Sequence, residues 1–183
     1  MRYYVEARSA NGAKAASFYP ARAEEDVLHY RVGLTNAANS PVIINEILAA
    51  NASTLADDQG EYDDWIELHN VTDQEVDLTG RYLSDEPHNP RKWAFPAGTK
   101  IPADGYLIVW ADEDGGAPVG LHASFKLDKG GEELYLTDTD ANFNAVLDSV
   151  IFGAQETDRA YGRSSADADV WLIMNPTPGQ PNP

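Results

Sequence analysis

The chain has 183 residues with 13 basic and 30 acidic side chains, a formal net charge of -17 and no cysteine. The missing cysteines exclude disulfide frameworks, thiolate zinc sites and cysteine nucleophiles. The acidic balance argues against a nucleic-acid partner, because phosphate-backbone binding depends on lysine and arginine. Apolar residues make up 43% of the chain, enough for a buried core, and no apolar run approaches the roughly 20 residues that insert across a membrane.

The first 34 residues contain two strand-like runs, Tyr3 to Ala7 and Leu28 to Leu34. Two strands cannot bury a core alone, so we expect residues 1–34 to be a partial β-segment that ends a preceding module. Residues 35–41 (TNAANSP) are small, polar and end in proline, which is linker composition.

From residue 42 onward, short strand-like runs alternate with glycine and aspartate turn signals, and at most one short helix is expected. Strands at this spacing predict an all-β chain that folds as an antiparallel β-sandwich over residues 42–175. The proline-rich residues 176–183 (PTPGQPNP) predict a semi-rigid linker and indicate a fragment of a longer multidomain protein. The predicted strands are 42–48, 64–70, 76–78, 81–84, 92–95, 106–110, 133–137, 146–152 and 170–173.

An acidic stretch precedes the second of these strands, with five carboxylates within eight residues: Asp57, Asp58, Glu61, Asp63 and Asp64. These side chains repel one another unless they are solvated, protonated or bridged by a cation. Calcium accepts six to eight oxygen ligands from flexible loops, although the stretch does not match the EF-hand pattern. Two interpretations stay open, a calcium site and a solvated acidic loop, and no other cofactor is indicated.

Strand 64–70 alternates, so that Trp65, Glu67 and His69 share one face and the apolar Ile66 and Leu68 share the other. Aromatic rings on an exposed sheet face can stack on sugars, which makes the first face a candidate ligand face. The alternative is that the tryptophan packs in the core.

Glu46 and Glu67 lie within apolar strands, where carboxylates are rare unless they are paired. We expect both to be hydrogen-bonded, with Arg81, Arg159 or Arg163 as candidate partners.

Catalytic motifs are missing from the sequence. There is no G-x-S-x-G elbow and no phosphate-binding glycine loop, and the four histidines show neither H-x-H nor H-E-x-x-H spacing. We therefore expect no catalytic residues and no enzyme activity.

A set of phrases in fixed order over residues 42–181 resembles the lamin tail domain family. The resemblance implies an immunoglobulin-like β-sandwich with an accessory role, of the type found in bacterial secreted or surface proteins. Relatives in the nuclear envelope bind proteins and chromatin, but a charge of -17 has the wrong sign for chromatin. The phrases are INEI (44–47), DDWIELHN (63–70), VDLTGRYLSD (76–85), WAFP (93–96), IPADGY (101–106), FKL (125–127), YGR (161–163) and PTPG (176–179).

Taken together, the sequence predicts a non-catalytic accessory, adhesion or protein-interaction module of a larger extracellular or cell-surface protein. Its partner would be a protein or a surface glycan, bound through a sheet face or an edge strand, beside neighbouring modules of the same chain. The alternative is a carbohydrate-binding module with a structural calcium ion.

Overall fold

The structure is a computed structural model that describes residues 40–114 and 119–183. The expectations for residues 1–34 and for most of the 35–41 linker lie outside this range. The described residues form β-sheets with one 3-10 turn, η1 (Asp140–Asn142), which connects the strands Glu133–Thr137 and Val146–Ile151. The predicted all-β class is confirmed.

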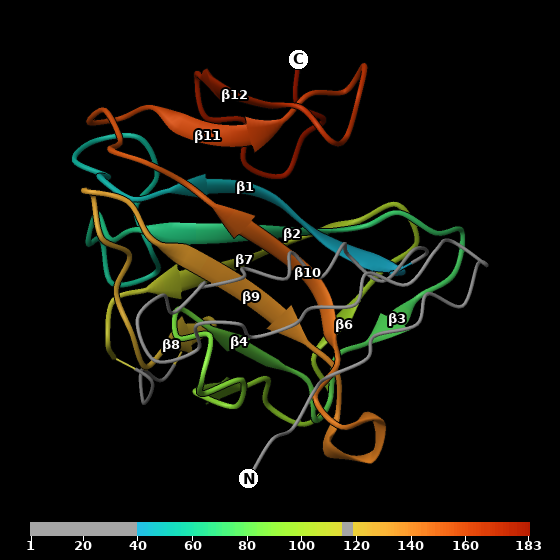
Figure 1. Cartoon of the computed structure of the whole chain (residues 1–183). Coiled ribbons are helices and arrows are strands. Elements are labelled where there is room, and N and C mark those ends of the chain that lie inside the picture. Colours follow the sequence, from blue (N-terminus) through green and yellow to red (C-terminus); the bar gives the residue numbers. More distant parts are fainter. Residues whose placement is uncertain (1–39, 115–118) are drawn as a thin grey trace, which may run out of the picture. The chain divides into compact units, whose positions relative to one another are not determined.

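Two sheets form the layers of the sandwich, and the hairpin of β9 and β10 crosses in front of β1, β2 and β7 in Figure 1. Among the described strands, all pairs are antiparallel except β7 with β8. The larger sheet has the order β12 (Trp171–Met174), β11 (Ala160–Arg163), β1 (Val42–Leu48), β2 (Trp65–Asn70), β7 (Tyr106–Ala111), β8 (His122–Ala123). The smaller sheet has the order β10 (Val146–Ile151), β9 (Glu133–Thr137), β4 (Tyr82–Ser84), β5 (Trp93–Ala94), and a separate pair joins β3 (Val76–Asp77) to β6 (Lys100–Ile101).

Each run predicted from residue 42 onward contains a strand, whereas β6, β8 and β11 were not predicted. β6 and β8 have two residues each, too short for an alternating pattern. β11 has four residues and includes Gly162, which strand propensity disfavours.

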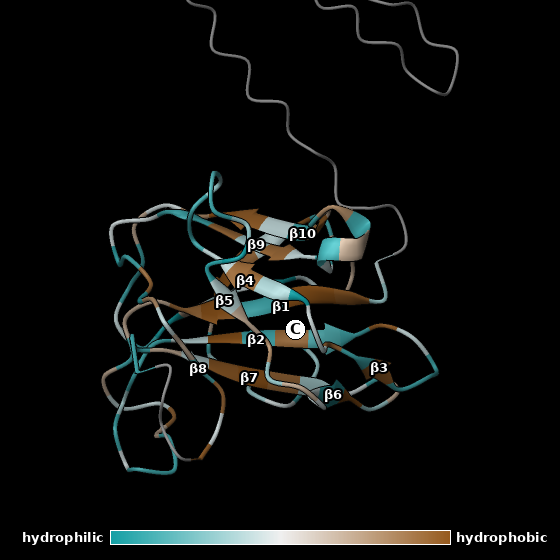
Figure 2. Ribbon diagram, turned by 90° about the horizontal axis from the view of Figure 1, so that it is seen from below, coloured by the Kyte–Doolittle hydropathy of each residue, from teal (hydrophilic) through white to brown (hydrophobic). Residues whose placement is uncertain are grey.

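The core lies between the two sheets, and Ile66 and Leu68 of β2 point into it as their alternation predicts. Apolar segments concentrate in the strands and polar ones in the connecting loops (Figure 2). The opposite face of the large sheet is also covered. Leu48, Trp65 and Trp110 form a second buried cluster there, against which Leu55 of the β1–β2 loop packs.

A buried ion pair ties the two sheets together beside a β-bulge in β1. The register of β1 against β2 shifts between Ile44 and Glu46. The N–H of Ile44 donates to Asp148 of β10 at 2.7 Å, and its carbonyl accepts from Arg163 of β11 at 2.7 Å. Arg163 in turn donates to both carboxylate oxygens of Asp148 at 2.8 Å. The bulge, β10 and β11 are therefore fixed at one point.

The C-terminal residues 176–183, expected to be a linker, fold back over the outer face of the large sheet. Thr177 donates its N–H and its hydroxyl to Glu46 at 3.0 and 2.9 Å. The N–H of Gly179 donates to Glu67 at 2.5 Å. Buried Asn182 donates to the carbonyls of Asn45 and Arg163 at 3.2 and 2.8 Å. This segment, called the C-terminal strap below, is part of the domain.

Candidate functional site

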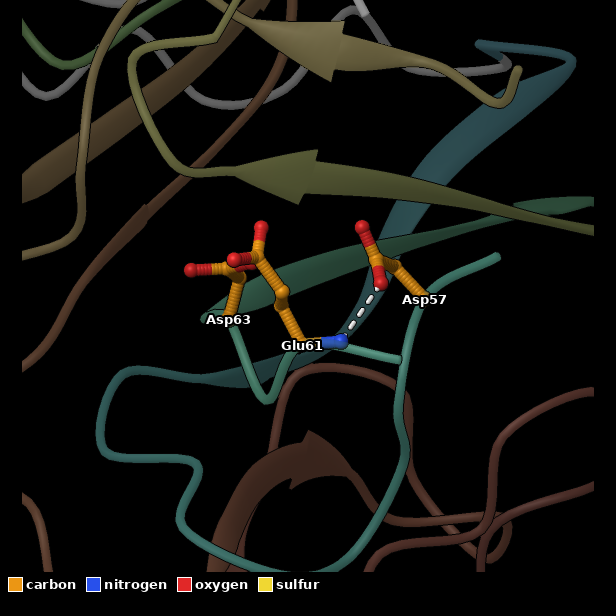
Figure 3. Close-up of side chains that lie close together, drawn as sticks. All are labelled: Asp57, Glu61 and Asp63. Carbon is orange, nitrogen blue, oxygen red and sulfur yellow. Dashed lines mark hydrogen bonds between the residues drawn. The ribbon is translucent and has the colours of Figure 1, made fainter. Parts of the chain in front are cut away.

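The acidic loop between β1 and β2 brings three of its five predicted ligands together. One carboxylate oxygen from each of Asp57, Glu61 and Asp63 lies within 4.8 Å of the other two. Figure 3 shows the three side chains close together on the loop. Asp57 organises the turn, because its Oδ1 accepts the N–H groups of Gln59 and Glu61 at 2.9 and 2.8 Å. Gly60, with φ 87°, supplies the left-handed conformation that closes this turn.

Asp63 is a member of the trio, and its pKa is shifted. Burial raises the pKa of Asp63, and the charges of Asp112 and Asp57 raise it further, against the opposing effect of Lys126 and His122. A bound cation would relieve this repulsion, and three carboxylates supply the oxygen ligands that calcium prefers. The trio is thus the part of the loop that fits a cation.

The other two predicted ligands lie elsewhere. Asp58 is exposed and outside the trio. Asp64 accepts the N–H of Asn51 at 3.0 Å, and burial raises its pKa to about 6. Asp64 therefore anchors the base of the loop.

Asn51 is a residue that the sequence reasoning missed. Its Nδ2 donates to the carbonyls of Leu55 and Asp63 at 2.6 and 2.8 Å, and its Oδ1 accepts from Thr54. The signal was an asparagine at a strand end followed by serine and threonine, a pattern typical of side-chain-capped turns. Asn51 holds the loop that presents the carboxylates.

A histidine–aspartate pair lies next to the acidic loop and was also missed. His122 Nδ1 is 2.5 Å from Asp112 Oδ2, and its Nε2 is 2.9 Å from the carbonyl of Val119. Burial lowers the pKa of His122, but the hydrogen bond and charge of Asp112 outweigh it, so the pKa is raised. Because both ring nitrogens face acceptors, the imidazolium form is favoured. Through it, β8 is linked to Asp112 at the end of β7 and to Val119.

The candidate ligand face of Trp65, Glu67 and His69 is not an exposed face, which corrects the sequence expectation. Trp65 is fully buried against the β1–β2 loop, and Glu67 is fully buried beneath the strap. His69 stacks on Tyr106 at 4.3 Å between ring centroids and lies 3.1 Å from Asp104. Alternation separated the two sides of β2 correctly, but it carried no information on what covers the outer side.

Glu46 and Glu67 are hydrogen-bonded, as expected, but none of the three candidate arginines is their partner. Glu46 bonds Thr177, and Glu67 bonds Asn45 at 2.8 Å and Gly179. Burial raises the pKa of Glu46 to about 7 despite its two bonds to Thr177, and burial also raises that of Glu67. Arg163 instead pairs with Asp148.

The two-layer antiparallel sandwich defines an immunoglobulin-like module in which buried polar groups maintain the fold. The chain belongs to the lamin tail domain family, whose model matches residues 35–153. Membership indicates a protein-interaction module. β11 and β12, which complete the large sheet, and the strap, which covers its outer face, follow the matched region.

A search of curated proteins found no match. Among residues 40–114 and 119–183, there is no helix with the length and apolar character needed to span a membrane.

Proposed function

We propose that this domain is a non-catalytic interaction module of a larger secreted or cell-surface protein. It binds an extended segment of another protein along the free edge of β12. The observation that carries the proposal is an apolar edge strand whose outer side pairs with none of residues 40–114 and 119–183.

β12 ends the large sheet, and within the described residues β11 is its only neighbour (Figure 1). The backbone N–H of Ser164 donates to the carbonyl of Val170 at 2.8 Å. This bond shows which residues of β12 form the hydrogen-bonded pairs with β11 and which form the non-hydrogen-bonded pairs. The main-chain groups of Leu172 therefore face β11, while those of Trp171 and Ile173 face outward. Such a row of unpaired donors and acceptors is a template for an added strand.

The side chains of this edge are suited to a protein partner. Val170, which precedes β12, and Leu172 and Ile173 within it are 44%, 41% and 46% exposed. Trp171 is held in place by Tyr161, at 5.1 Å between rings, and by Arg163, 4.7 Å from its ring. The edge is therefore apolar, and the Trp171 side chain is already packed before a partner arrives, which lowers the entropy cost of binding.

Several polar groups that could serve a reaction are instead bonded within the fold. His122 bonds Asp112 and Val119, Glu46 bonds Thr177, and Asp148 bonds Arg163. This use of acids and bases as structural groups supports a binding role. The extracellular setting remains part of the proposal, supported by the acidic surface and the calcium-compatible loop.

The edge-binding proposal is tested by selecting extended peptides from a displayed random library on the full-length chain. Ile173→Pro removes an outward N–H without removing a bond to β11, so selected peptides should lose most of their affinity. Phe143→Ala is the matched control, because Phe143 is 93% exposed on the β9–β10 turn. Peptides that bind both variants equally, or a library that yields no binder, would count against the proposal.

A second candidate function is calcium binding by the β1–β2 loop, favoured by the trio of Asp57, Glu61 and Asp63. The sequence also suggested a carbohydrate-binding module that uses exposed aromatic rings. Trp65 is buried, so it is not available to stack on a sugar. An ion here would stiffen the acidic loop against thermal motion.

Thermal unfolding in excess EDTA and in calcium tests this second candidate. Calcium at 100 times its dissociation constant stabilises by about 2.7 kcal/mol, which raises the melting temperature by about 5–11 °C for a domain of this size. Asp57→Asn and Asp63→Asn should abolish the shift, whereas Asp58→Asn, outside the trio, should retain it. The same shift in all three variants, or none in the native chain, would refute a site at the trio.

A further inference from the structure

We propose that the strand that fills the β12 edge is β12 of a second copy of this chain, so that two large sheets join into one continuous sheet. This inference rests on the edge-binding function proposed above and names its partner. Three properties of β12 carry it: its hydrogen-bonding pattern, its side chains and the charges at its two ends.

The hydrogen-bonding pattern fits antiparallel self-pairing about a two-fold axis at Leu172. In that register, Trp171 lies opposite Ile173 of the second copy, and Ile173 lies opposite its Trp171. Both residues direct their N–H and C=O groups outward, so the pairing satisfies the free main-chain groups of both strands. A register displaced by one residue would set outward groups against residues that already bond β11.

The side chains are self-complementary in the same register. The two Leu172 side chains meet at the axis as a non-hydrogen-bonded pair, the closer type of cross-strand pair. Ile173 packs beside Trp171 of the second copy on the other face, and Val170 lies opposite Met174. Thus the exposed apolar residues of the strand each gain a partner.

The charges at the two ends of β12 are opposite in sign. Asp167 and Asp169 precede the strand and are exposed. At the other end, Arg159 donates to Asn175. Antiparallel pairing sets Asp169 opposite Asn175 of the second copy and so beside its Arg159, twice per dimer. Exposed pairs of this kind contribute little affinity but help to fix the register.

The net charge of -17 on each copy opposes association at long range. This repulsion is screened beyond about 8 Å at 0.15 M ionic strength, and the ends of the strand contribute attraction at short range. A single-strand interface belongs to the small, transient class, so we expect a dissociation constant of about 10 µM to 1 mM.

Cysteine cross-linking on the full-length chain tests this register, because the native sequence has no cysteine. Leu172→Cys places two thiols at the axis within the distance that a disulfide bridges, so oxidation should yield a covalent dimer. Val170→Cys is the matched control, since it is similarly exposed but lies about 13 Å along the strand from its copy. Equal cross-linking of both variants, or none of Leu172→Cys, overturns the proposed dimer.

Sedimentation velocity at protein concentrations that span the expected dissociation constant gives a second readout. The native chain should show weak self-association that Ile173→Pro abolishes and Phe143→Ala retains. Arg159→Asp should weaken the self-association, because it places two acidic side chains opposite each other. Adding Asp169→Arg should restore the self-association, because the two charges are then opposite in sign again. A chain that stays monomeric while library peptides still bind the edge refutes the dimer but not the proposed function. Loss of both would refute both.

Discussion

At the scale of single residues, the pair of Asp148 and Arg163 connects three strands and leaves neither charge alone. Burial raises the pKa of Asp148, while the charge of Arg163 and the N–H groups of Ile44 and Ser149 lower it. The arginine also donates to the carbonyl of Ala168 at 2.5 Å, in the turn that precedes β12. Removing one partner would therefore leave a buried carboxylate without its countercharge.

We predict that Arg163→Met lowers the free energy of unfolding by about 3–5 kcal/mol, the usual cost of breaking a buried pair. Urea denaturation followed by tryptophan fluorescence measures this loss. Arg91→Met provides the control, because Arg91 and Asp140 form an exposed pair at 3.0 Å, which should contribute about 1 kcal/mol or less. Similar losses in both variants would show that the sheets do not depend on the buried pair.

The same residues show what local sequence can indicate. The rule that buried carboxylates need partners correctly marked Glu46 and Glu67 as bonded residues. It could not choose the partners, since Thr177 lies 131 positions from Glu46. Arg163 was a candidate for these acids, but the bulge at Asn45 brings it to Asp148 instead.

At the scale of elements, the C-terminal strap has no regular secondary structure and yet covers the outer face of the large sheet. Its proline content predicted an extended spacer, because proline cannot join a strand ladder. Its contacts come from single side chains and N–H groups, which leave no periodic pattern in the sequence. β2 was predictable because apolar and polar residues alternate along it, whereas the segment that covers Trp65 and Glu67 was not predictable.

We predict that Asn182→Ala lowers the free energy of unfolding by about 1–3 kcal/mol, since it leaves buried carbonyls without donors. Asn182 donates to the carbonyls of Asn45 and Arg163 and accepts from Thr177 at 2.9 Å. Differential scanning calorimetry against Gln180→Ala, an exposed strap residue expected within about 0.5 kcal/mol of the native chain, isolates the effect. Equal stability of the two variants would show that the strap is only loosely attached.

At the scale of the whole molecule, one buried and two half-buried carboxylates make stability depend on pH in an unusual direction. Burial raises the pKa of Glu46 and of Glu132 from 4.5 to about 7, and that of Asp64 from 3.8 to about 6. The folded state therefore binds protons more tightly than the unfolded chain. The stabilisation from each group is complete below its unfolded pKa and is lost as pH rises through its folded pKa.

We predict that the free energy of unfolding increases as pH falls from about 7.5 to 4.5. The slope of this free energy against pH should correspond to about one proton taken up by the folded state for each carboxylate with a raised pKa. Chemical denaturation at several pH values measures the slope. Glu46→Gln should flatten it by about one proton, whereas Glu75→Gln, in an exposed pair with Lys100, should not. A stability that falls on acidification across this window would contradict the prediction.

The distant contacts of β1 have a further consequence for a chain that emerges from the ribosome in order. β2 follows β1 soon, but Arg163 reaches Ile44 across 119 positions, and Thr177 reaches Glu46 across 131. Until residues 160–177 have been synthesised, the edge of β1 that will pair with β11 is open to pairing with other nascent chains. Glu46 interrupts that strand with a charge, as residues that guard against aggregation do. The carboxylate that weakens the finished domain at neutral pH would thus protect it while synthesis is incomplete.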